Sequence, residues 1–134
     1  MSTKKKILLV DDEEGLGRLV KLNLEETGHY EVRTETKGTQ AHLAAREFQP
    51  DLILLDVIMP DAKGPEVARE IQADKSLQDT PIVLFTAAML KETRGDAQRK
   101  AMGSFPLIEK PVNTAELIHH IEKALVKKAL DPKR

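Results

Sequence analysis

The chain has 134 residues, of which 40% are hydrophobic and 32% charged, and this fits one globular domain with a core of its own. The net charge of -1 and the aromatic content of 3% give no electrostatic or stacking basis for nucleic-acid binding, and the absence of cysteine excludes disulfides and thiol chemistry. The apolar stretch at residues 7–10 is too short for a signal peptide or a membrane span, so we expect a cytoplasmic protein with neither nucleic-acid nor membrane partners.

Patterns typical of strands and helices alternate along the chain. Short apolar or alternating runs predict five strands, at residues 7–10, 30–34, 52–55, 82–85 and 105–108. Apolar residues at helical spacing predict a helix after each strand, at residues 13–27, 39–48, from 64, 88–102 and from 113. The helix at 88–102 is the weakest, because it is polar and contains Gly95, and Pro106 interrupts the last strand.

Five such βα units predict an α/β fold, a doubly wound parallel five-stranded sheet with helices on both faces. Right-handed crossovers place the carboxyl ends of all strands at one edge, where ligands bind in sheets of this kind. No repeat, low-complexity tract or linker divides the chain. We therefore expect a single domain over residues 1–134, with its core at about residues 5–129.

Polar residues stand where the predicted strands end. Asp11 and Asp12 follow the first strand, Asp56 follows the third, Thr86 follows the fourth, and Lys110 lies just past the fifth. Because parallel strands share one carboxyl edge, we expect these residues to lie together. Adjacent carboxylates repel one another unless positive charge joins them. Lys110 supplies one charge, and Mg²⁺, a hard cation that takes oxygen ligands, suits the remainder.

This pattern resembles the receiver domain of two-component response regulators, over essentially the whole chain. The residues that carry the resemblance are the pair Asp11-Asp12, Asp56 in LLDVIMP, Gly64 eight residues further on, Thr86 in FTAA, and Lys110 in the EKP turn. Each motif alone is weakly specific, whereas all of them in this order are highly specific. The resemblance implies the flavodoxin-like (βα)5 fold with strand order 2-1-3-4-5.

The resemblance also implies a phosphoryl acceptor and a metal site. Asp56 takes the phosphoryl group from phosphohistidine on a sensor histidine kinase or a histidine phosphotransfer protein. Mg²⁺ is held by Asp12 and Asp56, with Asp11 acting through water and Ile58 through its carbonyl oxygen.

The resemblance also implies catalytic roles for two further residues. The Lys110 ammonium neutralises part of the phosphoryl charge, and the Thr86 hydroxyl donates a hydrogen bond to a phosphoryl oxygen. A cis bond before Pro111 is expected to fix the direction of Lys110. Enzymatic activity is expected only as self-phosphorylation and autodephosphorylation, without turnover of a separate substrate.

The chain departs from the family at Leu107, where many receivers carry Tyr or Phe. Phe105 is expected to point to the opposite face of the sheet. A change of rotamer at leucine alters less surface than one at an aromatic residue, and leucine has no hydroxyl. We therefore expect phosphorylation to change the surface formed by the fourth helix, fifth strand and fifth helix only modestly or differently.

Only a short tail follows the last helix, so we expect no output domain. Output then requires a downstream partner that the sequence leaves unknown, or onward phosphoryl transfer, and a weak homodimer is left open.

Two other functions remain as alternatives. The fold could serve as a constitutive protein-docking module, although the complete set of polar residues argues against this. A phosphatase with Asp56 as nucleophile is less favoured, because Ile58 stands where the second acid of a DxDx[TV] motif would be. Asp61 is interpreted as a solvated loop residue.

Overall fold

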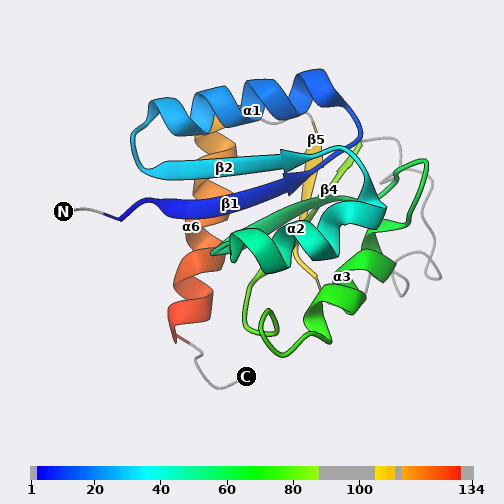
Figure 1. Cartoon of the computed structure of the whole chain (residues 1–134). Coiled ribbons are helices and arrows are strands. Elements are labelled where there is room, and N and C mark those ends of the chain that lie inside the picture. Colours follow the sequence, from blue (N-terminus) through cyan, green and yellow to red (C-terminus); the bar gives the residue numbers. More distant parts are fainter. Residues whose placement is uncertain (1–2, 88–104, 111–112, 131–134) are drawn as a thin grey trace.

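The computed structural model describes residues 3–87, 105–110 and 113–130, which form a parallel sheet covered by helices (Figure 1). The strands are β1 (Lys5–Val10), β2 (Tyr30–Glu35), β3 (Leu52–Asp56), β4 (Ile82–Ala87) and β5 (Leu107–Lys110). The helices are α1 (Glu14–Glu26), the 3-10 helix η1 (Gly38–Gln40), α2 (Ala41–Phe48), α3 (Gly64–Gln72) and α6 (Thr114–Leu130). The strand order is β2-β1-β3-β4-β5, and all four pairings are parallel, so the predicted flavodoxin-like architecture is confirmed.

The sheet separates two apolar cores. Helices α2 and α3 cover one face, and α1 and α6 cover the other (Figure 1). All five residues of β3 are buried: Ile53 and Leu55 face α2 and α3, whereas Leu52 and Leu54 face α1 and α6. Full burial of one such side chain contributes about 1.5–3 kcal/mol. A continuous apolar run is therefore what a central strand with two covered faces requires.

Most of the described elements differ from their predicted bounds by one or two residues, and two of the differences matter for the fold. The predicted helix at 39–48 is divided into η1 and α2, with Gln40 as the residue before α2. The last strand begins at Leu107 and not at 105, so Pro106 precedes the strand and does not interrupt it. Proline has no N–H for a strand pairing, but its carbonyl is free to accept. The carbonyl of Pro106 accepts the N–H of Leu84, at an N–O distance of 2.8 Å.

The prediction that Phe105 points away from the face of Leu107 is wrong. Leu107 pairs with Leu84, which faces α2 and α3, and Phe105 packs against the same core. Ile108 lies in the other core. Strand side chains alternate with a period of two, so residues two positions apart share a face. Leu107 is 40% exposed, whereas Phe105 is partly buried.

The expected helix at 88–102 and the expected cis bond before Pro111 lie outside the described residues. Within the part of the chain that the structure describes, no helix combines the length and the apolar character needed to span a bilayer.

Candidate functional site

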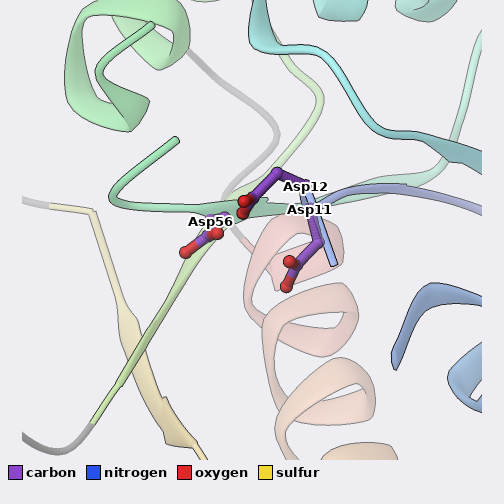
Figure 2. Close-up of side chains that lie close together, drawn as sticks. All are labelled: Asp11, Asp12 and Asp56. Carbon is purple, nitrogen blue, oxygen red and sulfur yellow. The ribbon is translucent and has the colours of Figure 1, made fainter. Parts of the chain in front are cut away.

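Three acids meet at the carboxyl ends of β1 and β3. These strands are neighbours, and Val10 pairs with Leu55, so Asp11 after β1 lies beside Asp56 at the end of β3. Asp11, Asp12 and Asp56 each place a carboxylate oxygen within 4.8 Å of the others. Figure 2 shows the three side chains close together, although they come from distant parts of the sequence. The acid cluster, as we call these three residues, therefore results from the parallel register of two adjacent strands.

Lys110, the last residue of β5, supplies positive charge to the acid cluster. Its Nζ lies 2.7 Å from Oδ2 of Asp11 and 3.6 Å from Oδ1 of Asp56. Asp11 is 2% exposed and Asp56 6% exposed, so water screens these charges weakly. The same Nζ lies 5.1 Å from the ring centroid of Phe85, within the range of a cation–π interaction.

The burial of the site changes its protonation. Burial raises the pKa of Asp56 from its ordinary value of 3.8 to about 7; the negative charge of Asp11 adds to the rise, and Lys110 opposes it. For Lys110, burial alone lowers the pKa, but the hydrogen bond to Asp11 and the charge of Asp56 outweigh it and raise the pKa overall. Lys110 therefore keeps its proton, whereas ionised Asp56 needs additional positive charge nearby.

The donor atoms fit a divalent cation of the Mg²⁺ type. Both oxygens of Asp11 already accept hydrogen bonds, Oδ1 from the N–H of Glu13 at 2.9 Å and Oδ2 from Lys110. Asp12 and Asp56 are not held by Lys110 at hydrogen-bonding distance in this way, and all three acids offer a carboxylate oxygen within reach of one shared ion. Mg²⁺ binds proteins through one or two carboxylates and retains several waters. One lysine against three carboxylates leaves negative charge that such a cation would neutralise.

The remaining predicted site residues occupy the same edge of the sheet. Thr86 lies in the last part of β4, where it pairs with Glu109, and Ala87 pairs with Lys110; the side chain of Thr86 is outside the described structure. Ile58 lies in the loop after β3 and forms an isolated antiparallel bridge with Lys63. Its side chain is 63% exposed.

Gly64 closes the loop after β3 by a close backbone approach. Its N–H donates to the carbonyl of Val57 at 2.9 Å, and the N–H of Val57 donates to the carbonyl of Phe85 at 3.0 Å. A Cβ at Gly64 would lie 2.3 Å from the carbonyl oxygen of Asp56 and 2.8 Å from the Cα of Val57. Only glycine allows the first turn of α3 to lie this close to the end of β3.

We expect Gly64→Ala to lower the free energy of unfolding by about 2–3 kcal/mol, because the methyl group overlaps backbone atoms that cannot rotate away. Urea denaturation followed by circular dichroism measures the change. Gly15→Ala is the matched control: a Cβ there meets nothing within 4 Å, and alanine favours the helix by up to about 1 kcal/mol. Equal stability of Gly64→Ala and the wild-type protein would contradict the steric account.

Sequence reasoning missed the roles of two residues. Asp61, interpreted above as solvated, accepts hydrogen bonds from Gly38 and Thr39. Phe85, a buried strand residue, packs under the Lys110 ammonium. Neither role has a local signal, because both contacts join segments whose distance depends on sheet register and on the packing of separate loops.

Comparison with known proteins adds the following findings. The model of the response regulator receiver domain matches residues 7–122. The polar-differentiation response regulator DivK of Brucella ovis is 33% identical over 122 residues, which cover 90% of this chain and 96% of DivK. The chemotaxis protein CheY4 of Vibrio cholerae has a similar structure, with a TM-score of 0.78 and 28% identity, covering 91% of this chain and 99% of CheY4.

Other relatives are longer than this chain. The phosphate regulon transcriptional regulatory protein PhoB of Rhizobium meliloti is 34% identical over 128 residues, which cover 92% of this chain and 53% of PhoB. The chain spans about half the length of the first curated relatives that it matches.

Proposed function

Because this chain belongs to the response regulator receiver domain family, we propose that it accepts a phosphoryl group on Asp56 and thereby signals to a partner protein. The phosphoryl donor is a sensor histidine kinase or a histidine phosphotransfer protein. The observation that best supports this function is the contact of Lys110 with both Asp11 and Asp56 beside the exposed acid Asp12. One nucleophilic carboxylate, one fixed cation and an acidic pair meet the needs of phosphoryl transfer.

The transfer step is a substitution at phosphorus. A carboxylate oxygen of Asp56 forms the new bond to phosphorus, and the bond between phosphorus and the donor imidazole nitrogen breaks. The electron pair of the broken bond remains on the imidazole, which gains a proton from water. Asp56 must be ionised to attack, and its raised pKa means that the protein alone does not fully favour this state at neutral pH.

The residues around Asp56 each have a defined part in this step. Lys110 holds a positive charge 3.6 Å from Oδ1 of Asp56, where it favours the ionised nucleophile and the charged phosphoryl oxygens. By family resemblance, Thr86 at the end of β4 supplies a hydroxyl donor for a phosphoryl oxygen. Mg²⁺ held by Asp12 and Asp56, by Asp11 through water and by the Ile58 carbonyl would supply the remaining neutralising charge.

The output surface is proposed to lie near β5. Leu107 is 40% exposed and has no hydroxyl, so a change of its rotamer alters less area and fewer hydrogen bonds than a change of tyrosine would. We therefore propose a downstream partner that reads a small change of surface at this strand.

Incubation of the protein with Mg²⁺ and acetyl phosphate, followed by intact mass measurement, tests the function. We expect the mass of one phosphoryl group to be added, and we expect chelation of Mg²⁺ to prevent the addition. Absence of an adduct with acetyl phosphate and with phosphorylated kinase would favour a constitutive docking module instead. Rapid turnover of many small phosphate esters would favour an Asp-nucleophile phosphatase.

A further inference from the structure

Asp61 joins the loop that follows Asp56 to the beginning of η1. Its Oδ1 accepts the N–H of Gly38 at 3.1 Å, and its Oδ2 accepts the N–H of Thr39 at 3.0 Å and the Thr39 hydroxyl at 2.9 Å. The hydrogen bond from the Thr39 N–H is the largest cause of a lowered pKa at Asp61, so the side chain is an ionised acceptor at neutral pH. One carboxylate thus satisfies three donors at the start of another element.

The two segments are also in close steric contact. A Cβ at Gly38 would lie 2.7 Å from the Cβ of Ala62 and 3.0 Å from the terminal methyl group of Met59. Met59 is buried in the core beneath α2 and α3, and Ala62 packs against that core. The backbone at Gly38 therefore rests directly on the loop, and the hydrogen bonds of Asp61 hold an interface that is already closely packed.

The segment bound by Asp61 also forms a hydrogen bond with the backbone of Asp11, which belongs to the acid cluster. The carbonyl of Glu35, three residues before Gly38, accepts the N–H of Asp11 at 3.0 Å. Residues 35–39 therefore bind Asp11 at one end and the loop after Asp56 at the other. Because Asp11 and Asp12 follow β1 whereas Ile58 belongs to that loop, this connection spans both sides of the proposed cation site.

We propose that Asp61 is a positioning residue that keeps the loop after Asp56 at the separation from Asp11 and Asp12 that a divalent cation requires. This inference rests on the proposed function, because the cation matters through the phosphoryl acceptor. Asp61 does not contact the acid cluster itself. It acts through Gly38, Thr39 and the short connection back to Glu35, in the way that outer residues orient metal ligands in other proteins.

The test compares Mg²⁺ dissociation constants measured by isothermal titration calorimetry. We expect Asp61→Glu to weaken Mg²⁺ binding about tenfold, because the longer side chain keeps the charge but moves the carboxylate away from its donors. Thr39→Val removes only the hydroxyl bond and leaves every charge unchanged, so we expect about a threefold loss. Asp79→Glu, the same substitution at an exposed acid outside this connection, is the matched control and should change the constant by less than twofold.

The outcomes separate this inference from the proposed function. Native circular dichroism with weakened Mg²⁺ binding in Asp61→Glu supports the positioning role, whereas lower stability with an unchanged constant overturns it. If Asp61→Glu fails to fold, Thr39→Val decides, and an unchanged constant there also overturns the inference. Mg²⁺ binding without any phosphoryl adduct in the wild-type protein would contradict only the proposed function. Absence of Mg²⁺ binding in the wild-type protein would contradict both.

Discussion

Asp56→Asn is expected to form no phosphoryl adduct with acetyl phosphate or with a phosphorylated histidine kinase. The neutral amide lacks the negative charge of a carboxylate and is a far weaker nucleophile, so a stable bond to phosphorus does not form. Asp11 is not expected to replace it, because its two oxygens accept hydrogen bonds from the Glu13 N–H and from Lys110. Intact mass after incubation with Mg²⁺ measures the loss. An adduct at the wild-type level in this variant would move the acceptor to another residue.

The same variant also tests the raised pKa of Asp56, through the pH dependence of stability. Asp56 has an ordinary pKa of 3.8, which applies to the unfolded chain, and a pKa of about 7 in the folded protein. Between these two values the folded protein binds more protons than the unfolded chain, so wild-type stability falls as pH rises through this range. Asparagine does not titrate and removes this decline.

We therefore expect Asp56→Asn without Mg²⁺ to be more stable than the wild-type protein at pH 8, by at most about 4 kcal/mol, and the difference to shrink towards pH 4. Urea denaturation at several pH values measures it. Saturating Mg²⁺ should reduce the difference, because a bound cation stabilises the ionised wild-type carboxylate. A constant difference across the range would contradict the raised pKa.

Lys110→Met is expected to slow adduct formation about 100-fold, since it removes a fixed positive charge beside the nucleophile and the transferred group. Methionine keeps much of the side-chain volume, so the effect arises chiefly from the charge. The variant also leaves buried Asp11 without its positively charged partner, and we expect a loss of about 3 kcal/mol in stability. Rates of adduct formation from acetyl phosphate, measured at a temperature where both proteins are folded, give the comparison.

Lys75→Met is the matched control for this second prediction. Lys75 is exposed in the turn after α3, so its replacement removes the same charge from the chain but not from the acid cluster. We expect adduct formation at close to the wild-type rate. If Lys110→Met also phosphorylated within about threefold of the wild-type rate, the ammonium would have no part in the transfer.

The sequence alone determined that the chain forms a parallel sheet covered by helices, and which polar residues lie at the carboxyl edge of that sheet. Apolar runs such as residues 52–55, each followed by a helical pattern, have few solutions other than a parallel sheet covered on both faces. In such a sheet an acid after one strand and an acid at the end of its neighbour share an edge. The hydrophobic pattern therefore places Asp11 and Asp56 at one edge of the sheet, and the resemblance to the receiver family, which implies the order 2-1-3-4-5, places their strands next to each other.

Only the tertiary structure decided which atoms meet at that edge. It showed that Lys110 lies nearer to Asp11 than to Asp56, and that Asp61 binds Gly38 and Thr39. These contacts join segments far apart in the sequence, and each depends on distances of a few ångströms between separately packed loops. A sequence pattern records which side of an element faces the core, but it does not record the distance between two loops at its ends.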